Sequence, residues 1–286
     1  MAEPIRDAAF YSREYNNRKL VPDHGQIFAH WSAESAKARN TMTCYLDRRY
    51  GEMPGETMDI FPARMTGDGT CMMFIHGGYW RSLDKSDHSF LAPPWVGAGV
   101  SVAVVNYDLC PAVTIEDIVR QMLRASRWLY LHCEDYGMDQ DRLYVAGHSA
   151  GGHLAAMMMA AHWSVYDREL PKDLFKGGLA VSGLYDLRPL VEVDFLKDDL
   201  RLDEAAAAKV SPALMPPATR MPIATCVGQQ ESSEFHRQAQ LLKDRWRSTV
   251  TEVPMPGANH FTVLDALADR GSPLFAGARR MMKLDK

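Results

Sequence analysis

A serine set among small residues is the first candidate for chemistry in this sequence. Gly147-His148-Ser149-Ala150-Gly151 fits the pattern G-x-S-x-G, which places a serine on a strained turn between a strand and a helix. The apolar run 143–146 predicts that strand, and the alanine- and methionine-rich run 152–161 predicts the helix. Side chains at the two glycine positions would collide with the neighbouring helix or strand. The motif therefore predicts Ser149 as a nucleophile, with the Ala150 N–H directed at the same point.

A second stretch could hold developing negative charge. His76-Gly77-Gly78-Tyr79-Trp80 follows the apolar run 71–75, which predicts a strand buried on both faces. Two glycines at a strand end allow a tight turn in which consecutive N–H groups point at one spot, as an oxyanion hole requires. We expect His76 to orient this loop rather than to act as a base. At least one of Tyr79 and Trp80 should line a substrate pocket, and the alternative for Trp80 is packing under the loop.

A serine nucleophile needs a base and an acid that orients the base. His260 follows the last predicted strand in a glycine-bearing loop, which places it at the carboxyl edge of the sheet, where ligands bind in such folds. Three carboxylates remain open as its partner. Glu231 follows the preceding strand and is favoured, Asp186 ends an earlier strand, and Glu234 should point one helical turn away.

Strands and helices alternate along the chain, which predicts one α/β domain with a mostly parallel, doubly wound sheet covered by helices. Residues 1 to about 40 are interpreted as an N-terminal arm and helix that carries no identifiable chemistry. Residues 183 to about 217 form a long connection, interpreted as a small cap over the site. The strands expected to build the sheet are 43–47, 57–62, 71–75, 100–107, 143–147, 178–182, 223–228 and 250–253.

Composition excludes several classes of function. The net charge of −4 gives no reason to expect nucleic acid or an anionic membrane as partner, and no run approaches eighteen apolar residues. The five cysteines contain no C-x-x-C pair, so neither a disulfide framework nor a zinc site is indicated. No phosphate-binding glycine motif supports a nucleotide cofactor. We expect a cytoplasmic protein that binds a small molecule without metal or cofactor, and we allow for a homodimer.

In this order, the segments HGGYW, GHSAGGH, VGQQE and GANHF resemble the α/β-hydrolase superfamily. Within it, H-G-G-x-W resembles the kynurenine formamidase (arylformamidase) and related esterase branch. The resemblance runs from about residue 59 to 264. It implies a nucleophile, acid and base at Ser149, Glu231 and His260, and backbone donors to an oxyanion at Gly77, Gly78, Ala150 and, as a further candidate, Tyr79. Glutamate stands where aspartate is commoner, which keeps Asp186 as an alternative.

These observations predict a serine hydrolase that works by two-step acyl transfer. The expected substrates are aryl formamides or aryl esters with short acyl groups, because aromatic residues follow the glycine loop. Long-chain esters should be poor substrates, since the predicted cap offers no long apolar stripe. The alternatives are a carboxylesterase of other substrate range and a catalytically silent binding protein of the same fold, which would be expected to lose Ser149 or His260.

Overall fold

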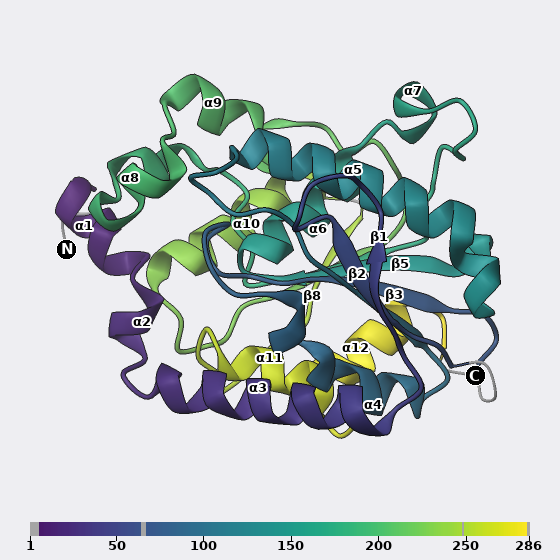
Figure 1. Ribbon diagram of the computed structural model, residues 1–286. Helices are drawn as coiled ribbons and strands as arrows, with labels where there is room; N and C mark the ends of the chain where they lie inside the picture. Colours follow the sequence, from purple (N-terminus) through teal and green to yellow (C-terminus); the bar gives the residue numbers. More distant parts are fainter. Residues whose placement is uncertain (1–5, 64–66, 248, 285–286) are drawn as a thin grey trace.

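The computed structural model describes residues 6–63, 67–247 and 249–284, so the first five residues of the predicted arm lie outside the described ranges (Figure 1). Its centre is an eight-stranded sheet in the order β1-β2-β4-β3-β5-β6-β7-β8. The pairs β1–β2 and β2–β4 are antiparallel and the others are parallel, which confirms the mostly parallel α/β fold. The strands are β1 (Tyr45–Arg49), β2 (Thr57–Phe61), β3 (Cys71–Ile75), β4 (Ser101–Val105), β5 (Leu143–His148), β6 (Gly178–Val181), β7 (Ile223–Cys226) and β8 (Val250–Glu252).

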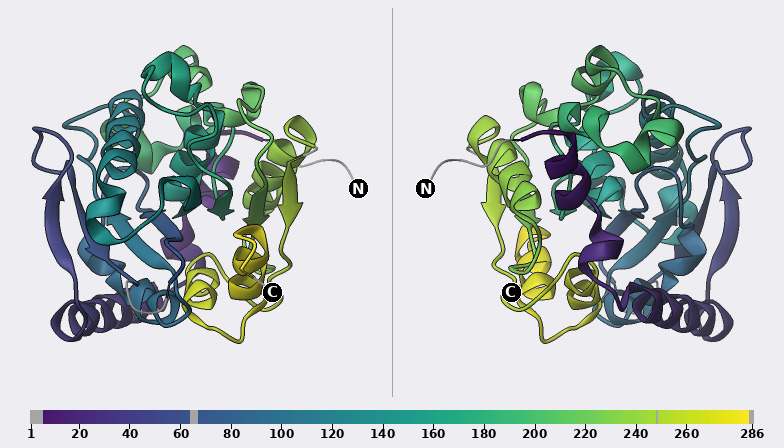
Figure 2. Two further views of the ribbon diagram at one scale, coloured as in Figure 1. Left: turned by 90° about the vertical axis from the view of Figure 1, so that its right-hand side faces the viewer. Right: turned by 90° about the vertical axis from the view of Figure 1, so that its left-hand side faces the viewer.

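Helices cover both faces of this sheet (Figures 1 and 2). One face carries α5 (Ile115–His132), α6 (Ala150–Ala160) and α10 (Ser233–Arg245). The other carries α3 (His24–Thr41), α4 (Ala92–Val96), α11 (Thr262–Ala268) and α12 (Pro273–Met281). None of the helices in the described ranges is long and apolar enough to cross a membrane.

The central strands divide their side chains between two cores. Along β3, Cys71, Met73 and Ile75 pack into one core, and Met72 and Phe74 pack into the other. This alternation follows from the two-residue period of a strand, and both sets are apolar because helices cover both faces. The resulting sheet is a rigid base for the loops at its carboxyl edge.

Strand register brings the candidate residues to one edge. Ile75 pairs with Gly147, His148 pairs with Val181, and Val181 pairs with Cys226. The loops that follow β3, β5, β6 and β7 therefore begin side by side, although the first follows Ile75 and the last follows Cys226. Such a carboxyl edge is where open α/β sheets bind their ligands.

Two segments outside the sheet approach the same edge. The N-terminal segment, residues 6–41, consists of α1 (Ala8–Glu14), α2 (Asn17–Leu20) and α3, and Figure 2 shows it running along one side of the molecule. The connection after β6, residues 183–217, contains α8 (Lys197–Leu200), α9 (Glu204–Lys209) and three short 3₁₀ turns. The two segments touch: Ser12 Oγ accepts a hydrogen bond of 3.1 Å from the Asp194 N–H.

Candidate active site

Ser149 occupies a strained turn between β5 and α6. Its backbone angles are φ 56° and ψ −118°, a region that side-chain-bearing residues rarely adopt. A Cβ on Gly147 would lie 2.1 Å from the Gly151 carbonyl oxygen, and one on Gly151 would lie 1.9 Å from that of Ile75. The two glycines are therefore required for the close approach of α6 to the sheet. The turn holds the Ser149 hydroxyl at the carboxyl edge.

His260 and Glu231 extend from this hydroxyl in one hydrogen-bonded chain. His260 Nε2 lies 3.0 Å from Ser149 Oγ, and His260 Nδ1 lies 2.6 Å from Glu231 Oε2. The other carboxylate oxygen of Glu231 accepts the Ser182 hydroxyl and the Gly228 N–H, both at 2.6 Å. A carboxylate can only accept, so Nδ1 carries the proton and Nε2 presents its lone pair to the serine hydroxyl. The arrangement can remove a proton from Ser149.

The two alternative acids are held elsewhere. Asp186 forms a bidentate ion pair with Arg188, with contacts of 2.9 and 2.8 Å. Glu234 accepts the Tyr15 hydroxyl at 2.8 Å and pairs with Arg237 at 2.6 Å. The structure therefore brings Glu231, of the three candidates, to His260.

The glycine loop after β3 lies against the serine. Gly78 has φ 103°, and a Cβ on it would lie 2.0 Å from the Ser82 carbonyl oxygen, so only glycine fits this turn. A Cβ on Gly77 would lie 3.1 Å from Ser149 Cβ, which shows how closely the loop approaches. Within the described ranges, the N–H groups of Gly77, Gly78 and Ala150 donate to no protein acceptor. These donors are free to bind an oxyanion.

His76 orients this loop, as expected. Its Nδ1 lies 2.8 Å from the Gly77 carbonyl oxygen and its Nε2 lies 3.0 Å from Asn106 Oδ1. The Tyr107 hydroxyl donates to the carbonyl oxygens of His76 and Gly77, and its ring stacks on the imidazole. Burial lowers the pKa of His76.

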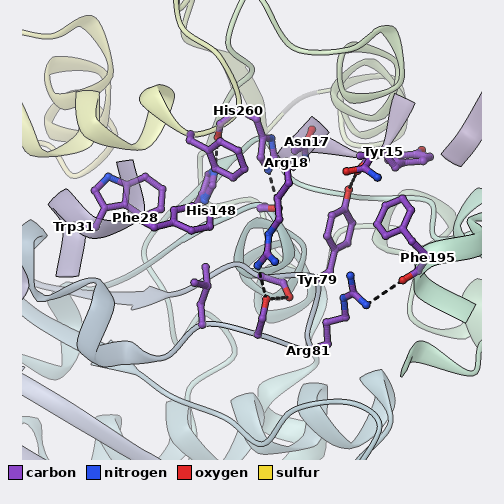
Figure 3. Close-up of a pocket in the computed structure, with 16 residues that line it drawn as sticks. Tyr15, Asn17, Arg18, Phe28, Trp31, Tyr79, Arg81, His148, Phe195 and His260 are labelled. Atoms are coloured by element: carbon purple, nitrogen blue, oxygen red, sulfur yellow. Dashed lines mark hydrogen bonds between the residues drawn. The ribbon is translucent and has the colours of Figure 1, made fainter. Parts of the chain in front are cut away.

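A cavity of about 200 Å³ opens above Ser149 and His260 (Figure 3). The glycine loop and its continuation contribute Gly78, Tyr79, Arg81, Ser82 and Leu83, and Phe195 reaches the cavity from residues 183–217. The N-terminal segment contributes Tyr15, Asn16, Asn17, Arg18, Phe28 and Trp31. His148 and Phe261 complete the wall. The expectation that the N-terminal segment carries no chemistry is therefore corrected, because this segment forms much of the cavity wall.

The two aromatic residues after the glycine loop behave differently. Tyr79 lines the cavity, and its hydroxyl donates to the backbone carbonyl of Tyr15 at 2.6 Å. Trp80 has no exposed surface, packs edge-on against His153 and is absent from the cavity wall. This corrects the expectation of substrate contact for Trp80, because its ring is buried against His153 and not in the cavity wall.

His148 supports the candidate base rather than replacing it. Its Nε2 donates to the backbone carbonyl of His260 at 2.7 Å, and the two rings lie 4.9 Å apart. Burial and the neighbouring His260 hold the pKa of His148 well below its usual value. In the described ranges, no group of three or more His, Cys, Asp or Glu side chains is arranged to hold a metal ion.

Comparisons with known proteins identify relatives of this chain. The BD-FAE family model matches residues 58–186. Kynurenine formamidase from Salmo salar is 33% identical over 82% of this chain and 80% of its own, and that from Danio rerio is 32% identical over 85% and 84%. A solved structure from Silicibacter sp. TM1040, provisionally assigned as a thioesterase, is 30% identical with a TM-score of 0.81, covering 93% of this chain and 97% of that chain.

Fold, site and relatives together define a class: a serine hydrolase of ester or amide bonds with the α/β-hydrolase fold. The chain belongs to the kynurenine formamidase family.

Proposed function

We propose that this chain hydrolyses short-acyl aromatic formamides or esters with Ser149 as nucleophile, His260 as base and Glu231 as orienting acid. The observation that carries the proposal is the hydrogen-bonded chain from Ser149 through His260 to Glu231, which ends in a small cavity with aromatic walls. The names of the relatives, formamidase above all, support this substrate class.

The first step is acylation of the serine. Ser149 Oγ attacks the substrate carbonyl while His260 Nε2 takes the hydroxyl proton, and Glu231 stabilises the imidazolium that forms. The negative charge on the carbonyl oxygen is bound by N–H groups of Gly77, Gly78 and Ala150, which have no protein acceptor in the described ranges. The tetrahedral intermediate collapses when the imidazolium gives its proton to the leaving amine or phenol.

The second step releases the acyl group. A water molecule gives its proton to His260 and attacks the acyl carbon, so the oxyanion forms again in the same place. Collapse of this intermediate breaks the bond to Ser149 Oγ, and the imidazolium returns the proton to the serine. Formate or a short carboxylic acid leaves, and neither step requires a metal or an organic cofactor.

The shape of the cavity supports small substrates. Its volume of about 200 Å³ is below the roughly 300–1,000 Å³ typical of drug-sized ligands. Phe28, Trp31 and Tyr79 offer aromatic faces to a leaving group, as in N-formylkynurenine or an aryl acetate. Phe195 reaches the cavity from residues 183–217, which supports the proposal that this segment is a small cap. A single domain and a cytoplasmic location complete the proposal, which also allows for a homodimer.

Labelling with a fluorophosphonate and hydrolysis of aryl acetates and N-formyl aryl amides test the proposal together. Ser149→Ala should abolish labelling and lower kcat/KM about 10⁴-fold or more, because the members of such a relay act as a unit. Ser164→Ala is the matched control, since Ser164 is exposed and lies outside the cavity wall. Wild-type protein that neither labels nor hydrolyses would favour the silent binding protein. A folded Ser149→Ala variant with a tenth of wild-type activity would end the serine mechanism.

A further inference from the structure

The cavity wall contains more positive than negative charge. Arg18 and Arg81 are among its lining residues, and no aspartate or glutamate is. Arg81 is compensated, because it pairs with Asp199 and donates to the carbonyl of Phe195 at 3.0 Å. The remaining charge belongs to Arg18.

Arg18 has no carboxylate partner in the described part of the chain. Its guanidinium donates to Ser82 Oγ at 3.3 Å and lies 5.8 Å from the centre of the Phe28 ring. Figure 3 shows the side chain extended between His148 and Tyr79, directly over the cavity. A guanidinium held in this way offers its remaining N–H groups to a ligand.

We propose that Arg18 binds a carboxylate on the leaving group of the substrate and so determines which aromatic leaving groups are accepted. This rests on the proposed function, in which the same cavity receives the substrate. The acyl group is fixed between Ser149 and the glycine loop, so the leaving group lies along the aromatic wall. Arg18 stacks on Phe28 in that wall, and a carboxylate accepts charge-assisted hydrogen bonds from a guanidinium.

Two isosteric esters test the proposal: the acetyl esters of 3-(3-hydroxyphenyl)propanoate and of 3-(3-hydroxyphenyl)propanamide. Two methylenes separate the varied group from the ring, so the leaving phenols have closely similar pKa values. Wild-type kcat/KM should favour the carboxylate about 10- to 100-fold. Arg18→Gln should reduce this ratio to within about threefold of one. Lys19→Gln is the charge-matched control, because Lys19 is exposed on the same helix outside the cavity wall.

Binding to an inactive variant separates this proposal from the proposed function. Titration calorimetry with the two free phenols on Ser149→Ala should show the same preference for the carboxylate and the same loss in Ser149→Ala/Arg18→Gln. Equal affinities for the two phenols, or an unchanged preference without Arg18, would overturn the carboxylate site. If neither ester is hydrolysed but the carboxylate still binds preferentially, the hydrolase mechanism is wrong and the carboxylate site stands.

Discussion

Replacing Glu231 by glutamine tests the relay most sharply, because every position around this carboxylate is a donor. One oxygen faces His260 Nδ1, and the other faces both the Ser182 hydroxyl and the Gly228 N–H. Glutamine has one oxygen and one NH₂ group, so it cannot accept from both sides. With its oxygen toward Gly228, the NH₂ faces His260 and forces the tautomer in which Nε2 carries the proton. That imidazole cannot take a proton from Ser149.

The size of the effect follows from this tautomer exchange. Loss of the orienting acid costs about 10³- to 10⁴-fold in kcat in triads of this kind, or about 4–5.5 kcal/mol of transition-state stabilisation. In the opposite orientation the NH₂ group faces the Gly228 N–H, and that unpaired donor costs about 1–3 kcal/mol of folding stability. We expect the first orientation, because its oxygen keeps two of the three hydrogen bonds.

Initial rates on an aryl acetate, with thermal unfolding measured in parallel, distinguish the two cases. Asp186→Asn is the matched control, since it removes one negative charge from a buried carboxylate that bonds Arg188 rather than His260. It should keep kcat within a few-fold of wild type. A folded Glu231→Gln variant with kcat within tenfold of wild type would refute the assignment of Glu231, and a crippled Asp186→Asn would move the acid one strand earlier.

Two further predictions concern the substrate range and the pH dependence of stability. Across acyl chains of two to twelve carbons, kcat/KM for aryl esters should be highest at two, because the cavity of about 200 Å³ cannot hold a lipid tail; a maximum at eight or more would contradict this. Burial lowers the pKa of His153 to about 4 and that of His88 to about 3, whereas in the unfolded chain both lie near 6.5. The unfolded state therefore binds more protons below pH 6.5, and unfolding free energy should fall by about 2 kcal/mol per histidine between pH 7 and 5. Urea unfolding of His153→Gln should show a decrease about 2 kcal/mol smaller than wild type, and equal decreases would contradict the prediction.

The arrangement of residues at the carboxyl edge could be predicted because it depends on short, local patterns. The glycines around Ser149 are required by a turn only five residues long. The buried strands can be predicted because they are apolar runs. Thr114 likewise caps α5 as expected, accepting the Asp117 N–H at 3.1 Å. In the turn, the strands and the helix cap, the residue types are enough to predict the local geometry.

The part of the cavity wall that comes from the N-terminal segment could not be predicted, because its contacts are long-range. For example, the Tyr79 hydroxyl donates to the Tyr15 carbonyl across 64 positions. Nothing in the types of Tyr15, Phe28 or Trp31 separates a residue that lines a cavity from one that packs in a core. The aromatic content of the N-terminal segment was the available signal. It indicated that the segment is buried, but it did not indicate which part of the protein the segment packs against.

The N-terminal segment also sets an order of events during protein synthesis. Tyr15 has no exposed surface in the folded chain, and its hydroxyl donates to Glu234, which lies 219 positions later. At about 5–20 residues per second, a ribosome needs roughly 10–45 s to add those positions. During that time the aromatic residues of the N-terminal segment lack the later part of the chain that covers them in the folded protein. The wall that selects the substrate is thus among the first parts of the chain to be made and among the last to acquire its place.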